Sequence, residues 1–206
     1  MNLANQLTML RIALVPVLVL FMYLNNFWMR IFALIIFVCA AVTDLYDGLL
    51  ARKYNEVTTL GIFLDPLADK LLISAAFITF VGLKELHIPA WMVIIILTRE
   101  FVITGLRSLA ASKNVIISAH QSGKIKTASQ VTAIIIMLLI LIVNAGLWRY
   151  YHIVPAALLA SPDSSRYLLG WVLSKFPFWI MLAVTILTVY SGVSYLKQHK
   201  ALLSEK

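Results

Sequence analysis

The chain has 206 residues, of which 62% are hydrophobic and only 13% are charged, and its formal net charge is +8. Soluble domains are nearer half apolar and about a quarter charged, so this composition excludes an ordinary soluble domain and indicates a polytopic membrane protein. The positive charge does not indicate a nucleic-acid partner, because the basic residues are spread over the ends of apolar segments rather than along one polar face.

Six apolar segments are long enough to cross a bilayer as helices, which takes about 20 residues each. We expect these spans at residues 8–24, 28–52, 60–82, 89–111, 121–147 and 178–195. A short amphipathic stretch, residues 2–7, precedes the first span and is expected to form a short interfacial helix. Residues 148–177 contain several prolines and are interpreted as an extramembrane loop with a partial apolar stretch. The sequence therefore predicts an all-α fold in which residues 1–206 form a single transmembrane domain.

The distribution of lysine and arginine predicts the orientation of these spans. If both termini lie on one side of the membrane, ten basic residues flank that side and five flank the other. Cytoplasmic loops carry the excess of lysine and arginine in membrane proteins. Both termini are therefore expected in the cytoplasm, and so is the turn between the second and third spans.

Four of the nine acidic residues of the chain surround that turn: Asp44, Asp47, Asp65 and Asp69. The first two are spaced i, i+3 and the last two i, i+4, so each pair shares one face of its helix. An aspartate at the centre of a membrane helix costs about 3 kcal/mol, which calls for a compensating role. All four lie at a similar depth from the cytoplasmic helix ends, where their carboxylates can meet in a cavity open to the cytoplasm.

Two kinds of chemistry would stabilise such a carboxylate cluster, because like charges in a low dielectric cannot all stay ionised unaided. The first is protonation, as in an ion or proton transporter. The second is a pair of metal ions, and oxygen-only ligands favour Mg²⁺ or Mn²⁺. The neighbouring residues favour metal-assisted phosphoanhydride chemistry. Gly48 and Ala51 leave space beside the carboxylates, and Arg52 adds a cation, whereas ion carriage needs none of these.

The stretch fits the pattern D-x2-D-G-x2-A-R-x8-G-x3-D-x3-D without a mismatch. The fixed positions are Asp44, Asp47, Gly48, Ala51, Arg52, Gly61, Asp65 and Asp69. In this it resembles the CDP-alcohol phosphatidyltransferase family. The resemblance implies a membrane enzyme with six transmembrane helices, usually a homodimer, that cleaves CDP-diacylglycerol. It further implies a bacterial cell-membrane location, with membrane lipids as neighbours and the active site facing the cytoplasm.

The resemblance also implies roles for individual residues. Asp44, Asp47 and Asp65 would hold two divalent cations together with the CDP pyrophosphate. Asp69 would share a metal ion and act as the catalytic base on the acceptor hydroxyl. The CDP-lipid would be bordered by Asp44, Asp47, Gly48, Ala51, Arg52 and Gly61. Thr8, at the cytoplasmic end of the first span, is a further candidate for contact with the nucleotide or a lipid headgroup.

The acceptor is predicted from the second half of the chain. Arg99, Arg107, Lys124 and Lys126 converge on the cytoplasmic side, and such cations are the usual partners of phosphate. The alternative is that some of them only anchor helices at the membrane surface. Positions i and i+2 face apart on a helix, so Lys124 and Lys126 cannot both point inward.

Three segments sharpen the prediction of the acceptor: NQLTMLRIALVPV, LTREFVITGLRSLAASKN and SGKIKTASQ. They resemble the bacterial phosphatidylglycerophosphate synthases of this family, in which the acceptor is sn-glycerol 3-phosphate and the products are phosphatidylglycerophosphate and CMP. Inositol phosphate, serine and phosphatidylglycerol stay open as alternative acceptors.

Overall fold

The protein is described by a computed structural model that covers residues 3–54, 59–112, 121–160 and 166–198. These residues form helices and connecting turns, with no β-strand among them, which confirms the predicted all-α class. The elements are α1 (Leu3–Tyr23), α2 (Phe27–Tyr54), α3 (Thr59–Gly82), η1 (Lys84–Leu86), α4 (Ala90–Ser112), α5 (Gln121–Tyr151), η2 (Pro155–Ala160), α6 (Tyr167–Ser174) and α7 (Phe176–Gln198).

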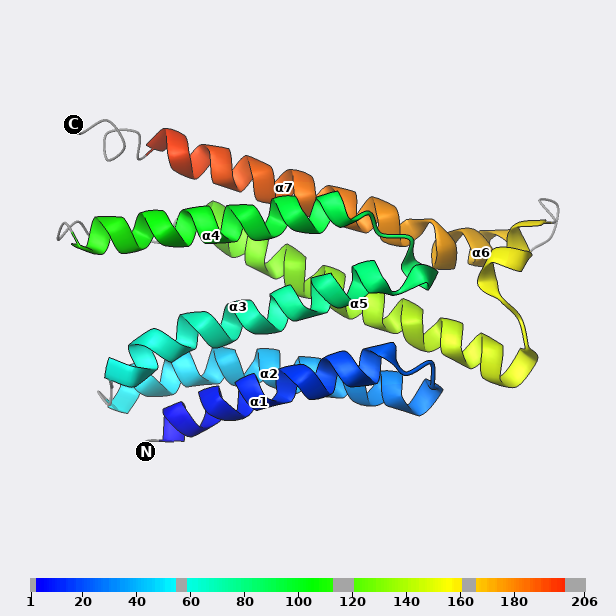
Figure 1. Cartoon of the computed structure of the whole chain (residues 1–206), viewed down its shortest axis with the longest axis horizontal. Helices are drawn as coiled ribbons and strands as arrows, with labels where there is room; N and C mark the ends of the chain where they lie inside the picture. Colours follow the sequence, from blue (N-terminus) through cyan, green and yellow to red (C-terminus); the bar gives the residue numbers. More distant parts are fainter. Residues whose placement is uncertain (1–2, 55–58, 113–120, 161–165, 199–206) are drawn as a thin grey trace.

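Six long helices (α1 to α5 and α7) run alternately in opposite directions along the long axis of the molecule (Figure 1). The first residues of α1 and the last residues of α7 lie at the same end, which we call the near end (Figure 1). The opposite end, with the α1–α2 turn and η1, is called the far end. Helix α1 packs on α2 and α3, and α4 packs on α7. Helix α5 contacts both α2 and α7 and so connects the two groups.

Within the described residues, three helical segments are long and apolar enough to cross a membrane: Gln6–Tyr23, Ile125–Tyr151 and Phe176–Gln198. The same part of the chain holds two shorter apolar segments, Phe27–Thr43 and Lys70–Gly82. The outside of the bundle is also apolar, since Ile94 and Ile186 expose 61% and 60% of their surface. A membrane protein is therefore supported, while the predicted number of six spans stays a prediction.

The boundaries of α2 and α5 have clear local causes. The Oδ1 atom of Asn26 accepts a hydrogen bond from the N–H of Trp28 at 2.9 Å, and this side-chain cap satisfies a free donor in the first turn of α2. Helix α5 ends before His152, whose φ of 54° is left-handed. The N–H of His152 donates to the carbonyl of Trp148 at 3.1 Å and closes the last turn.

Two expectations about the extramembrane parts need correction. Residues 3–7 do not form a separate interfacial helix, because they continue without a break into α1. Residues 148–177 are not a plain loop, since α5 extends into them and η2 and α6 follow. Helix α6 packs closely on η2 at Gly170, where a Cβ atom would lie 2.8 Å from the Cβ of Leu158. This close approach depends on glycine and is not visible in the local sequence pattern.

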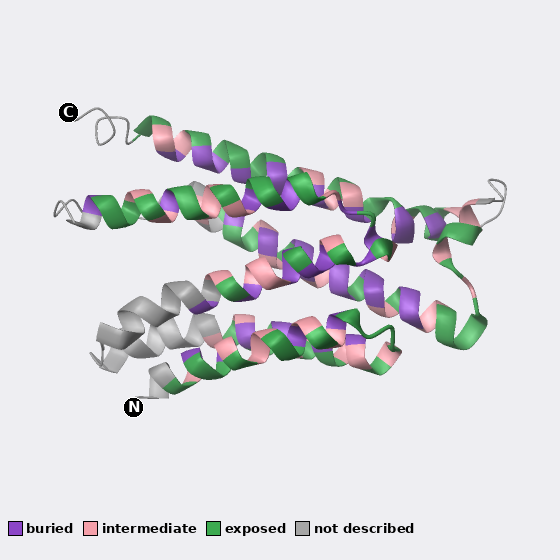
Figure 2. Ribbon diagram, in the orientation of Figure 1, coloured by how far each residue is buried: buried purple, intermediate pink, exposed green. Residues whose placement is uncertain are grey.

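The apolar core fills the interior of the bundle, and large side chains on different helices are fully buried there. Phe37 on α2, Phe77 on α3 and Met137 on α5 each have 0% of their surface exposed. Buried positions follow the inward faces of the helices, and exposed positions follow the outward faces (Figure 2). Because the core is apolar, each buried charged or amide side chain needs a partner or a ligand.

Candidate functional site

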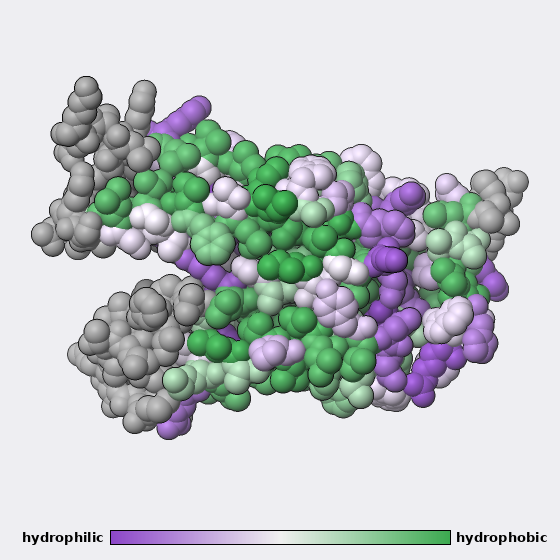
Figure 3. Space-filling view, in the orientation of Figure 1, coloured by the Kyte–Doolittle hydropathy of each residue, from purple (hydrophilic) through white to green (hydrophobic). Residues whose placement is uncertain are grey.

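A cavity of about 1050 Å³ lies between helices α1 to α5. Figure 3 shows the surface hollowed toward the near end, with hydrophilic side chains at the edge of the hollow. Its described ionisable lining consists of five cations and one carboxylate: Arg11, Lys70, Arg99, Arg107, Lys126 and Glu100. Apolar residues, among them Phe37, Leu72 and Ile96, form another part of the wall. Small-molecule pockets typically have this size and this mixture of apolar walls with a few polar groups.

Glu100 lies at the centre of the charged lining. The ammonium of Lys126 forms an ion pair with Oε1 of Glu100, and Nη1 of Arg99 lies 3.6 Å from the same oxygen atom. Arg99 also reaches α7, where its Nη2 atom donates to Oγ of Ser191 at 3.0 Å. The side chain of Lys126 is only 6% exposed. One carboxylate thus faces two cations, and the cluster keeps a net positive charge that suits an anion.

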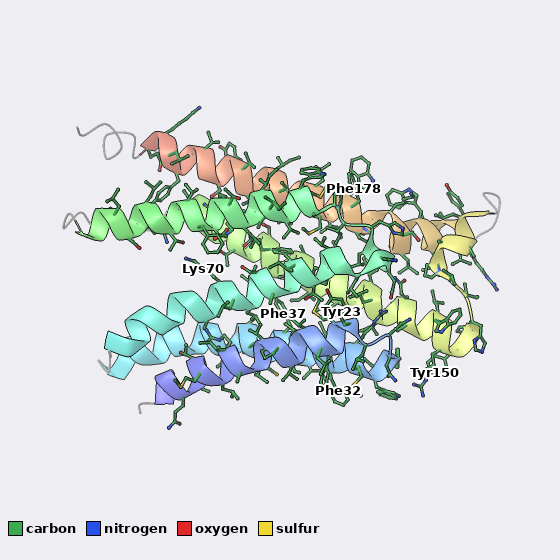
Figure 4. All side chains as sticks on the ribbon, in the orientation of Figure 1. Tyr23, Phe32, Phe37, Lys70, Tyr150 and Phe178 are labelled. Carbon is green, nitrogen blue, oxygen red and sulfur yellow. The ribbon has the colours of Figure 1, made fainter. Side chains whose placement is uncertain are left out.

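Lys70 connects the predicted acidic stretch to this cluster. Its ammonium donates a hydrogen bond to Oγ1 of Thr104 on α4, and this hydroxyl donates to the carbonyl of Glu100 at 2.7 Å. Figure 4 shows Lys70 extending from α3 into the space toward α4. Because Lys70 follows Asp69 directly in α3, the backbone of the acidic stretch borders the wall of the cavity.

Two further cations, one on α4 and one on α1, line the cavity. Arg107 on α4 is exposed, and its guanidinium carbon lies 5.7 Å from the centre of the Tyr195 ring on α7, within cation–π range. Arg11 on α1 is buried, with 2% of its surface exposed. Thr8 lies one turn before Arg11 and is 1% exposed, but it is not part of the described lining.

The structure therefore brings together three of the four predicted acceptor residues. Arg99, Arg107 and Lys126 all line the same cavity, although they come from different helices or different turns of one helix. The backbone of Lys124 lies in α5, but its side chain falls outside the described residues. Phosphate contact by these residues stays a prediction.

Apart from Thr8 on α1, the predicted metal and CDP-lipid residues lie in α2 and α3, on both sides of the four residues that separate the two helices. The structure does not describe the side chains of these predicted residues, which are Asp44, Asp47, Gly48, Ala51, Arg52, Gly61, Asp65 and Asp69. Within the described part of the chain, no group of three or more histidine, cysteine or acidic side chains could hold a metal ion. The metal site thus stays a prediction from the sequence.

The structure adds residues that the sequence did not single out. Gln130 on α5 lines the cavity and is 0% exposed. Its only sequence signal is its i, i+4 spacing from Lys126, which places both on one helix face. Gly192 on α7 gives room to Arg99, since a Cβ atom there would lie 2.9 Å from Cγ of Arg99. Neither Gly192 nor Ser191 belongs to a motif, so their contact with α4 could not be predicted.

Comparison with known proteins identifies the family. Residues 1–190 match the family described as CDP-alcohol phosphatidyltransferase. The chain is 44% identical over 150 residues to the CDP-diacylglycerol–glycerol-3-phosphate 3-phosphatidyltransferase of Bacillus subtilis (strain 168). The aligned region covers 67% of this chain and 77% of that protein. The chain is 41% identical over 138 residues to the protein of the same name from Rickettsia typhi, and this aligned region covers 67% of this chain and 76% of the relative.

A third relative with that name, from Escherichia coli (strain K12), is 38% identical over 139 residues, covering 65% of this chain and 74% of its own length. The family match spans the acidic stretch on α2 and α3 as well as the helices that line the cavity. The chain therefore belongs to the CDP-alcohol phosphatidyltransferase family.

Proposed function

We propose that this protein is an integral membrane enzyme that transfers a phosphatidyl group from CDP-diacylglycerol to sn-glycerol 3-phosphate, giving phosphatidylglycerophosphate and CMP. The observation that carries the proposal is the basic cavity of about 1050 Å³, which begins where the acidic stretch on α3 ends. Relatives named for this reaction are 38% to 44% identical to the chain and support the same activity here.

The cavity is the proposed site of the acceptor. Among its described lining residues, five cations outnumber one carboxylate, and this part of the wall favours a small anion such as a phosphate monoester. Lys126, Arg107 and Arg99 would bind the phosphate, and Lys124 is a further candidate. Serine lacks a phosphate group for the described cations of this cavity to bind, so we favour glycerol phosphate over it.

The acidic stretch is the proposed site of the metal ions and of the CDP-lipid. The donor set of Asp44, Asp47, Asp65 and Asp69 contains only oxygen and fits two Mg²⁺ or Mn²⁺ ions. Bound there, divalent ions would neutralise the pyrophosphate and the departing CMP. Gly48, Ala51, Arg52, Gly61 and Thr8 would border the CDP-lipid.

The residues of the chain would then carry out an in-line displacement. The acceptor hydroxyl attacks the phosphorus that bears diacylglycerol, and the bond from this phosphorus to the oxygen of CMP breaks. A carboxylate oxygen of Asp69 accepts the hydroxyl proton. Lys70 follows Asp69 in α3 and lines the acceptor cavity, so this helix would border both substrates.

The proposed membrane arrangement has six spans, formed by α1 to α5 and α7, with the near end in the cytoplasm. The alternating directions of these helices and the positions of the first residues of α1 and last residues of α7 support an even number of crossings (Figure 1). CDP-diacylglycerol would enter from the surrounding lipid, and sn-glycerol 3-phosphate from the cytoplasm. A homodimer is the proposed assembly, by resemblance to the family.

An acceptor screen tests this function. Purified protein in detergent is given CDP-diacylglycerol, Mg²⁺ or Mn²⁺, and one of four acceptors: sn-glycerol 3-phosphate, inositol phosphate, serine or phosphatidylglycerol. We expect CMP release that depends on sn-glycerol 3-phosphate. Release of CMP only with another acceptor would contradict the proposal. An ion transporter would instead take up ions into sealed vesicles and release no CMP, and nothing in the family match favours it.

A further inference from the structure

Gln130 is a buried amide in the wall of the cavity, and its polar atoms have no hydrogen-bond partners within the described part of the chain. It lies on α5, has 0% of its surface exposed and lines the cavity. Neither its Nε2 nor its Oε1 atom has a hydrogen-bond partner among the residues that the structure describes. Buried polar side chains are nearly always paired, and an amide left unpaired on both sides is costly. An amide in this position is therefore suited to a ligand that enters the cavity.

The position of Gln130 relates it to the proposed phosphate site. It follows Lys126 by four residues, so both side chains share one face of α5, about 6 Å apart along the helix axis. Lys126 lies nearer to the start of α5, which is at the near end, and Gln130 lies one turn deeper. A small ester whose phosphate binds Lys126 and whose carbon chain points inward would bring its first hydroxyl toward Gln130.

The chemistry of the amide selects among such ligands. The Oε1 atom needs a donor and the Nε2 atom needs an acceptor. A phosphate dianion offers only acceptors and an ammonium only donors, whereas a hydroxylated phosphate ester offers both. Of the two hydroxyls of sn-glycerol 3-phosphate, the terminal one reacts and the middle one is left over.

We propose that Gln130 binds the middle, non-reacting hydroxyl of the acceptor and so selects polyol phosphates over simpler phosphate esters. This inference rests on the proposed function. The hydroxyl donates to Oε1 of Gln130, and Nε2 donates to an oxygen atom of the same ligand. Gln130 thereby orients the terminal hydroxyl away from Lys126 and toward the acidic stretch.

The test compares two acceptors that differ only in this hydroxyl. They are sn-glycerol 3-phosphate and 3-hydroxypropyl phosphate, which keeps the phosphate and a terminal hydroxyl. For the wild type we expect kcat/KM, measured by CMP release, to be about 10- to 100-fold higher with sn-glycerol 3-phosphate. In Gln130→Met, which keeps the length of the side chain and removes the amide, this preference should fall below about threefold.

A matched control separates binding from packing. Asn144 is another buried amide on α5, 5% exposed and with no described partner for its Oδ1 atom, but it is not part of the described cavity lining. Asn144→Leu should therefore keep the acceptor preference of the wild type, even if it lowers stability. If Gln130→Met lowered kcat/KM equally with both acceptors, Gln130 would have only a structural role and the inference would be overturned.

The comparison of the two acceptors in the wild-type protein also tests the inference without any variant. A wild type that is active with sn-glycerol 3-phosphate but treats both acceptors alike would overturn the inference and leave the proposed function intact. A wild type that releases no CMP with either acceptor would overturn the proposed function itself. The two failures are therefore distinguishable.

Discussion

Two partly buried clusters of arginine and glutamate lie toward opposite ends of this molecule, and they differ in how their charges are satisfied. At the far end, Arg30 on α2 is 1% exposed and forms a two-pronged ion pair with Glu85, with distances of 2.6 and 2.9 Å. Its Nη1 atom also donates to the carbonyl of Leu141 on α5 at 2.8 Å. Here one cation meets one anion, and neither residue lines the cavity.

At the near end, Glu100 is shared by Arg99 and Lys126, and the exposed Arg107 adds a further cation. The amide of Gln130 lacks a partner within the described part of the chain. A buried charge therefore does not by itself mark a binding site, because a matched pair can serve packing alone. What distinguishes the near-end cluster is an excess of positive charge among its described residues and an unpaired amide beside a cavity.

The largest effect is expected next to the near-end cluster, at Asp69. Asp69→Asn should lower turnover by about 10²- to 10⁴-fold, because the base that accepts the hydroxyl proton is lost. Binding of metal and CDP-lipid should largely survive in this variant, whereas Asp44→Asn should lose both binding and turnover. CMP release and CDP-lipid binding, measured side by side, check this. Equal loss of binding in the two variants would mean that Asp69 is chiefly a metal ligand.

The next largest effect is expected at Lys126. Lys126→Met removes the ammonium that pairs with Glu100 and is proposed to bind the acceptor phosphate, so kcat/KM for sn-glycerol 3-phosphate should fall about 10- to 100-fold. Most of this loss should appear in the KM for sn-glycerol 3-phosphate, and little in the KM for CDP-diacylglycerol. Lys84→Met, at an exposed lysine of η1, is the matched control and should leave both constants unchanged. A loss shared equally by both substrates would contradict acceptor binding.

A smaller effect is expected at Gly192. Gly192→Ala places a Cβ atom 2.9 Å from Cγ of Arg99 and must displace this side chain from Ser191, which should lower activity about three- to tenfold. Gly105→Ala on α4 is the matched control, since a Cβ atom there meets nothing within 4 Å. Full activity in Gly192→Ala would show that the position of Arg99 has no influence on the reaction.

The smallest effect on activity is expected at the far end. Arg30→Met leaves the partly exposed Glu85 without its partner and should lower stability by about 2–4 kcal/mol, because the buried member of the ion pair is lost. The remaining folded protein should keep its kcat/KM within about twofold. Thermal unfolding in detergent, with activity normalised to folded protein, measures both. Removing both charges in Arg30→Met/Glu85→Leu should recover part of the stability. If Arg30→Met lowered activity more than Lys126→Met does, this would contradict the conclusion that the far-end ion pair serves stability and the near-end cluster serves activity.

Much of the helical layout could be predicted from the sequence. The third and fourth spans, expected at 60–82 and 89–111, match α3 and α4 to within a residue at each end. Long apolar runs and the glycine and proline residues between them mark such boundaries clearly. The short helices η2 and α6 were missed, because the contact of Gly170 with Leu158 depends on a fold of the chain that no local pattern encodes.

The residues of the candidate site were predicted in part. Spacing and charge were sufficient to select Arg99, Arg107 and Lys126, which the structure brings to one cavity. Their partners could not be predicted, because Ser191 lies 92 residues from Arg99 and is joined to it only by the packing of α4 on α7. The unpaired state of Gln130 is likewise a property of the packed bundle, since it depends on which neighbours surround the amide.

The proposed reaction transfers the phosphatidyl group to sn-glycerol 3-phosphate, and the ratio of its two products tests this transfer. Wild-type protein is incubated with CDP-diacylglycerol, divalent metal and sn-glycerol 3-phosphate that carries a label on its carbon chain. Released CMP and lipid-bound label are then measured in the same sample. We expect equal amounts of released CMP and lipid-bound label at all times. CMP release without lipid-bound label would reveal hydrolysis of the CDP-lipid and would contradict the account.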